Sequence, residues 1–153
     1  MKTLFSLVLL CAYPLAGAQD VITGLVVGIS DGDTIKVLTP EKKQLRVRLA
    51  EIDAPESAQA FGSRSKQSLS DLCYRATATL LVQDVDRYGR LVAAVECGGA
   101  SAQEHQLVNG MAWVYDRYVK DRSLYAIQRN AQQEGRGLWS DHNPTPPWEF
   151  RRQ

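Results

Sequence analysis

Residues 30–56 read SDGDTIKVLTPEKKQLRVRLAEIDAPE, and the rest of the chain is most easily understood from this stretch. Two runs within it, residues 34–38 and 45–52, alternate apolar and polar side chains, which is typical of half-buried β-strands. Asp31-Gly32 is a tight-turn signal before the first run, and residues 39–43 are a polar hairpin loop between the two. The stretch therefore predicts a pair of antiparallel strands with acidic residues at its ends.

Charged side chains of both signs collect at the ends of these predicted strands. Asp33, Asp53 and Glu56 are carboxylates of the kind that bind a divalent cation. Arg48 lies on the polar face of its strand, and Arg90 follows later in the run DRYGR; a guanidinium can hold phosphate oxygens through paired N–H bonds. Each residue alone is more simply a turn or a surface ion-pair residue. Together they favour phosphodiester hydrolysis, which needs a cation and positive charge at the phosphate.

The remaining pattern predicts a small barrel. Val21 to Ile29 reads as a strand with Gly24 and Gly28 at bulges or bends, and Ser101 with Glu104 forms a capping box. Further strands are expected at residues 77–85 and 91–97, and helices at 64–73, 101–109 and 121–134. Three strands, a helix, two strands and two helices do not make a βαβ rhythm. The expected class is α+β, mainly β: a five-stranded OB-like barrel with three helices.

The two ends of the chain differ from its middle. Residues 1–18 combine Lys2, a short apolar run and Ala16-Gly17-Ala18, which predicts a cleaved signal peptide; the alternative is an uncleaved anchor or a buried helix. Residues 19–141 are expected to form one domain, and residues 142–153 an extended tail that Trp148 and Phe150 fasten to it. The predicted localisation is extracytoplasmic, either periplasmic or secreted.

Charge is balanced in the predicted mature chain. Only one of the 18 Lys and Arg residues, Lys2, lies in residues 1–18, so 17 basic residues remain against 17 acidic ones. Strong nonspecific binding of nucleic acid would require a net positive charge. Any attraction for nucleic acid must therefore come from a local patch, for which Arg48, Arg87 and Arg90 are the candidates.

Two cysteines, Cys73 and Cys97, remain after residues 1–18. An even number in an exported protein predicts one disulfide; the alternative is a pair of buried free thiols.

The ordered set of motifs resembles the staphylococcal (thermonuclease-type) nuclease family. The matching segments are DGDT at 31–34, RLAEIDAPE at 48–56, DRYGR at 86–90, NGMAWVY at 109–115 and EGRGLW at 134–139. The resemblance extends from about Val21 to Trp139. The tail, PTPPWEFRR at 144–152, is similar to the secreted bacterial branch of that family.

The resemblance implies a calcium site. Asp33 and Asp53 match the carboxylates that hold Ca²⁺, and the backbone carbonyl of Ala54 matches a further ligand, although that position is commonly threonine in the family. Asp31 matches an acidic residue of the outer shell. Two carboxylates and one carbonyl leave room for phosphate and water around an ion that takes six to eight oxygens.

The resemblance also implies catalytic and substrate-binding roles. Glu56 matches the proposed general base, and Arg48 and Arg90 match the arginines that grip the scissile phosphate. Tyr88 and Tyr115 match contacts to the nucleotide, with Arg87 beside them as a further candidate. The implied reaction is cleavage of the P–O5′ bond of DNA and RNA, leaving 3′-phosphates.

Two other interpretations remain open at this point. A non-catalytic OB-fold protein would bind single-stranded nucleic acid by stacking and a basic groove. A secreted structural module would bind calcium for stability alone. The complete set of five site residues favours an enzyme over both. No feature requires an oligomer or a protein partner, so a monomer is expected.

Overall fold

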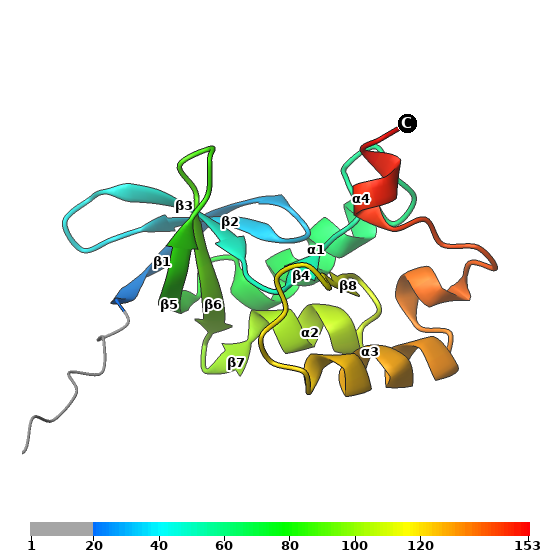
Figure 1. Cartoon of the computed structure of the whole chain (residues 1–153). Coiled ribbons are helices and arrows are strands. Elements are labelled where there is room, and N and C mark those ends of the chain that lie inside the picture. Colours follow the sequence, from blue (N-terminus) through cyan, green and yellow to red (C-terminus); the bar gives the residue numbers. More distant parts are fainter. Residues whose placement is uncertain (1–19) are drawn as a thin grey trace, which may run out of the picture.

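The computed structural model describes residues 20–153, so the signal peptide predicted for residues 1–18 lies outside the described residues. A curved sheet occupies one side and three helices pack beneath and beside it (Figure 1). The strands of this sheet are β1 (Val21–Asp31), β2 (Thr34–Leu38), β3 (Gln44–Leu49), β5 (Thr77–Val85), β6 (Leu91–Cys97) and the short β7 (Ala100–Ser101).

The sheet closes on itself into a barrel. Its strand order is β3-β2-β1-β5-β6-β7, and β3 pairs in addition with β6 in parallel, with Val47 opposite Leu91. Strands β1, β2, β3, β5 and β6 therefore form the expected five-stranded OB-like barrel. The register of β1 shifts between Val26 and Gly28, as expected for a bulge. Alternate residues of each strand fill the interior, including Val26, Ile35, Val47 and Leu80, all fully buried.

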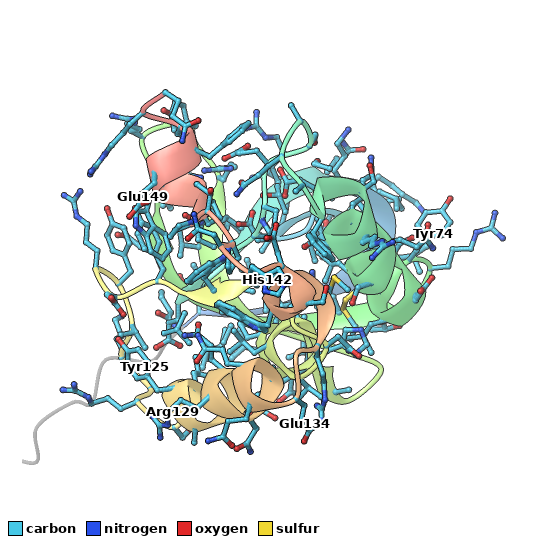
Figure 2. All side chains as sticks on the ribbon, turned by 90° about the vertical axis from the view of Figure 1, so that its right-hand side faces the viewer. Tyr74, Tyr125, Arg129, Glu134, His142 and Glu149 are labelled. Carbon is cyan, nitrogen blue, oxygen red and sulfur yellow. A yellow bond between two sulfur atoms is a disulfide. The ribbon has the colours of Figure 1, made fainter. Side chains whose placement is uncertain are left out.

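The three predicted helices are present as α1 (Gly62–Cys73), α2 (Ala102–Val108) and α3 (Leu124–Gln133). The Ser101 side chain accepts a hydrogen bond from the Glu104 N–H at 3.2 Å, which is one half of the predicted capping box. Cys73 at the end of α1 and Cys97 at the end of β6 form the predicted disulfide, drawn in yellow in Figure 2. This bond ties the first helix to the barrel.

The strand predicted for residues 45–52 is interrupted. β3 ends at Leu49, and the two-residue strand β4 (Ile52–Asp53) leaves the barrel to pair with β8 (Trp113–Val114). Glu51 lies between them in the left-handed region, with φ 67°. Its carboxylate accepts hydrogen bonds from the N–H groups of Lys120 and Asp121, so the bend is held by a distant loop and is invisible to strand periodicity.

The C-terminal tail is not wholly extended. After η1 (Gly137–Ser140) it runs extended and then forms one helical turn, α4 (Pro147–Phe150), beside the loop that precedes α1 (Figure 1). Pro147 occupies the start of this turn, where its fixed φ favours helix and its missing N–H costs nothing. Among residues 20–153, no helix has both the length and the apolar character needed to cross a membrane.

Candidate active site

The centre of the site is a buried group of one arginine and two carboxylates. Arg48 Nη2 lies 3.1 Å from Asp53 Oδ1 and 3.4 Å from Asp33 Oδ2. Arg48 Nη1 donates to the carbonyls of Leu49 and Ile52, each at 3.1 Å. The Asp53 side chain is 1% exposed and that of Arg48 is 15% exposed. The guanidinium is therefore fixed by three hydrogen-bond acceptors, including Asp53, and by an ion pair with Asp33.

Strand pairing explains why these residues meet. Thr34 pairs with Arg48 across the β2–β3 ladder, so Asp33, just before β2, stands next to Arg48. The bend at Glu51 then turns the chain so that β4 returns Asp53 to the same guanidinium. The N–H of Ala54 donates to Asp33 Oδ2 at 3.0 Å, which joins the two acidic segments directly.

The turn before β2 depends on close packing. A Cβ added to Gly32 would lie 1.9 Å from Ser65 Oγ and 2.8 Å from the Ala54 Cβ, so only glycine fits. The side-chain amide of Gln106 donates to the Gly32 carbonyl at 2.6 Å. Helices α1 and α2 thus hold the turn that carries Asp31 and Asp33.

Burial and mutual charge shift the titration of this group. Burial raises the pKa of Asp31 to about 6, and the neighbouring charge of Asp33 adds to the effect. Burial likewise raises the pKa of Asp53, although its bonds to Arg151 and Arg48 oppose the change. Burial would lower the pKa of Arg48, but the charges of Asp33 and Asp53 outweigh it and raise that pKa. The site concentrates negative charge that cations must balance.

Glu56 joins this group through Arg151, a tail residue that the sequence pattern did not assign to the carboxylates. Arg151, from the tail, binds Asp53 with Nη2–Oδ2 at 2.6 Å and Nη1–Oδ1 at 3.2 Å. Its Nη1 also donates to Glu56 Oε1 at 2.6 Å. Bonding to Asp53 raises the pKa of Arg151. A residue 98 positions from Asp53 thus bridges a predicted cation ligand and the predicted base.

Arg90 lies at the end of the β5–β6 hairpin, and within residues 20–153 its only ion pair is with Asp86. Its Nε donates to Asp86 Oδ2 at 2.7 Å, and Asp86 also accepts the N–H groups of Tyr88 and Arg90. The Tyr88 side chain is exposed, with the guanidinium groups of Arg87 and Arg90 at 4.8 and 5.5 Å from its ring centroid. The hairpin therefore presents positive charge and an aromatic face to solvent, next to the strand that carries Arg48.

Tyr115 is brought to the carboxylate group by the β4–β8 ladder. Its N–H donates to the Glu51 carbonyl at 2.8 Å, and the Arg48 guanidinium carbon lies 5.9 Å from its ring centroid. The indole of Trp148 stacks on the tyrosine ring with centroids 5.4 Å apart and an interplanar angle of 4°. The tail thus covers an aromatic face that the sequence assigned to substrate.

Comparison with known proteins identifies the family. The model of the family described as staphylococcal nuclease homologue matches residues 46–141. The chain belongs to this family. It is 45% identical over 150 residues to an uncharacterized endonuclease of Haemophilus influenzae, covering 98% of this chain and 84% of that protein. It is also 45% identical over 144 residues to the micrococcal nuclease of Shigella flexneri, covering 84% of this chain and 80% of the relative.

These similarities support a nuclease function. Arg48, Asp33, Asp53 and Tyr115 are brought together directly, and Glu56 joins them through Arg151. Arg87, Tyr88 and Arg90 lie together on the β5–β6 hairpin. The PWEFRR ending held no signal that Arg151 would bind carboxylates.

The donor set suits the metal ion that nucleases of this family generally use. Asp33 and Asp53 offer hard carboxylate oxygens, both buried, that converge on one nitrogen of Arg48. Asp31 Oδ1 accepts the Asp33 N–H at 3.1 Å, consistent with an orienting role. Within residues 20–153, no three His, Cys, Asp or Glu side chains form a complete cation site. Backbone, water and substrate oxygens would have to complete the coordination.

Proposed function

We propose that this chain is an extracytoplasmic, calcium-dependent endonuclease that acts as a monomer on DNA and RNA. It would hydrolyse the P–O5′ bond and leave a 3′-phosphate. The observation that carries the proposal is the convergence of two buried carboxylates on Arg48, with Glu56 and Tyr115 at the edge of the same group. The disulfide and the predicted signal peptide support export from the cytoplasm.

Each residue of the site has a role in this proposal. Asp33, Asp53 and the Ala54 carbonyl would hold the cation, which when bound polarises a phosphoryl oxygen. Glu56 takes a proton from the attacking water, a contribution of about 10²–10⁴-fold. Arg48 and Arg90 donate N–H bonds to the phosphoryl oxygens as their charge grows.

Aromatic side chains would hold the nucleotide. Tyr88 is 60% exposed and is flanked by Arg87, so it offers a base a stacking face with positive charge beside it. Tyr115 lies between the Arg48 guanidinium and Trp148 of the tail. Affinity would come from these local features because the predicted mature chain has no net charge.

The test is digestion of single-stranded DNA by the full chain, with calcium or with a chelator. Glu56→Gln should lower the cleavage rate by about 10²-fold or more while calcium binding persists. Glu96→Gln, an exposed glutamate on β6, is the matched control and should cleave at the normal rate. Binding of DNA without any cleavage in calcium would instead identify a non-catalytic binding protein. Unchanged turnover in Glu56→Gln would exclude Glu56 as the base.

A further inference from the structure

The C-terminal tail places a positive charge on the predicted cation ligands. Both Asp53 oxygens are bound by Arg151, at 2.6 Å and 3.2 Å, and Arg48 takes the second bond on Oδ1 at 3.1 Å. A cation held by the Asp53 carboxylate would lie about 2.3–2.6 Å from one of the same oxygens. Two positive groups so close together repel strongly in a site of low exposure. Because Arg151 engages both Asp53 oxygens, whereas Arg48 engages only Oδ1, Arg151 and a bound cation are alternatives at Asp53.

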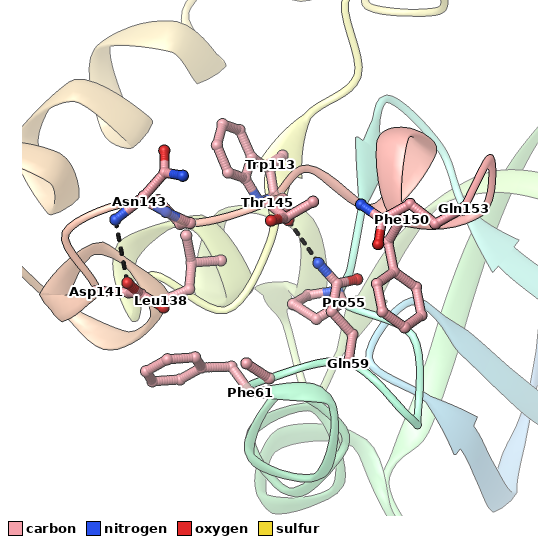
Figure 3. A pocket seen from close by; sticks show the side chains of 12 residues that line it. Pro55, Gln59, Phe61, Trp113, Leu138, Asp141, Asn143, Thr145, Phe150 and Gln153 are labelled. Carbon is pink, nitrogen blue, oxygen red and sulfur yellow. Dashed lines mark hydrogen bonds between the residues drawn. The ribbon is translucent and has the colours of Figure 1, made fainter.

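The same tail is anchored at several points, and these contacts restrict the position of the Arg151 backbone relative to the site. Trp148 packs edge-on against Trp113, with ring centroids 5.8 Å apart, and stacks on Tyr115. The Gln59 amide donates to the Thr145 carbonyl, drawn as a dashed line in Figure 3. Phe150 lies across from Pro55, beside a cavity of about 230 Å³ between the tail and the loop after β4 (Figure 3).

Arg151 and Trp148 of the tail occupy the two places where the site is expected to bind a cation and a nucleobase. The Arg151 guanidinium stands where positive charge is needed by Asp53 and Glu56. The Trp148 indole lies flat on Tyr115, as a nucleobase would. A tail that only stabilised the fold would require neither a guanidinium at these carboxylates nor a ring stacked on Tyr115.

We propose that Arg151 is an internal competitor of the divalent cation, so that the tail sets the cation concentration at which the site becomes active. With Arg151 docked, Asp53 and Glu56 are both engaged by the guanidinium. When the cation takes Asp53, the Arg151 side chain, which is 40% exposed, swings into solvent and releases Glu56 for its role as base. This inference rests on the proposed function, whose cation site it uses.

Calorimetric titration of the full chain with calcium chloride tests the competition without measuring activity. Arg151→Gln should bind calcium about tenfold more tightly than the unmodified chain, because no fraction of the site is then held by the guanidinium. Arg152→Gln is the matched control. It removes the same charge one position away, from a side chain that is exposed and makes no hydrogen bond or ion pair within residues 20–153, and should change the affinity less than about twofold.

Trp148→Ala provides a second variant that keeps the arginine. Loss of the stacking contact lowers the effective concentration of Arg151 at the carboxylates, so calcium should again bind more tightly, although by less than in Arg151→Gln. Thermal unfolding of each variant, without calcium, verifies that it is folded before titration.

The dependence of DNA cleavage on calcium separates competition from a direct catalytic role. Arg151→Gln should reach half-maximal rate at about tenfold lower calcium, with the same rate at saturation. Equal calcium affinities in Arg151→Gln and the unmodified chain would overturn the inference while leaving the proposed nuclease intact. A reduced saturating rate in Arg151→Gln would overturn it by making Arg151 a phosphate ligand. Absence of calcium binding in both proteins would defeat the proposed function as well.

Discussion

Arg48→Met removes the charge around which the site is built. The Arg48 guanidinium donates to the carbonyls of Leu49 and Ile52 and to Asp53 Oδ1, each at 3.1 Å, and the Arg48 side chain is 15% exposed. Methionine retains the apolar stem of the side chain but removes one of the two guanidinium groups that pair with the buried Asp53. Removing one partner of a buried ion pair costs about 3–5 kcal/mol. Arg151 still binds Asp53, so we expect the free energy of unfolding to fall by about 3 kcal/mol, the lower end of that range.

Urea unfolding at pH 7 with chelator, followed by tryptophan fluorescence, measures this cost. Arg90→Met is the matched control, because the ion pair of Arg90 with Asp86 lies at the surface hairpin and is worth about 1 kcal/mol or less. The double variant Arg48→Met/Asp53→Asn should be destabilised by less than the sum of the single variants, because it also removes the Asp53 charge that Arg48 balances. A cost for Arg48→Met no larger than that for Arg90→Met would refute the reasoning.

Three further outcomes follow from the packing and the charges. Gly32→Ala should destabilise the fold by about 3 kcal/mol in urea unfolding, because its Cβ would lie 1.9 Å from Ser65 Oγ; a loss under 1 kcal/mol would contradict this. Burial would raise the pKa of Asp86, but hydrogen bonds within the hairpin outweigh it and lower that pKa. Asp86→Ala should therefore cost about 1 kcal/mol at neutral pH, and the difference should vanish as pH falls from about 4 through the lowered native pKa; a cost that persists at pH 2 would count against the ion pair. Replacing Cys73 and Cys97 by serine should cost about 3.5 kcal/mol on the chain-entropy model, and an unchanged midpoint of thermal unfolding would argue that the bond is dispensable.

The barrel was predictable because its strands carry local signals. Leu45, Val47 and Leu49 alternate with polar residues, and the structure turns Val47 and Leu49 into the barrel interior. Asp33 and Arg48 follow from the same hairpin, since neighbouring antiparallel strands bring residues close in sequence to one end. The fold class and this part of the site could thus be predicted from short-range patterns.

What could not be predicted depends on contacts between distant segments. The break at Glu51 exists because its carboxylate caps a loop some 70 residues later, at Lys120 and Asp121. The alternation of apolar and polar residues, taken alone, predicted a strand that continues through residue 52. The position of Arg151 depends in turn on the stacking of Trp148 on Tyr115, a contact that no short-range sequence pattern predicts. Such tertiary contacts determine where a side chain points after its secondary structure ends.

The two arginines proposed to bind phosphate differ in how freely they can do so. Arg48 uses both Nη atoms on protein acceptors, so its first effect is to hold Asp33 and Asp53 together. Arg90 uses its Nε on Asp86, and within residues 20–153 its Nη atoms make no hydrogen bond. A bidentate grip needs two N–H groups on one edge of the fork, which Arg90 can offer without breaking a buried network. In the proposed reaction Arg48 would therefore organise the carboxylates and supply fixed charge in addition to its own N–H bonds, whereas Arg90 has both Nη groups available for the arriving phosphate.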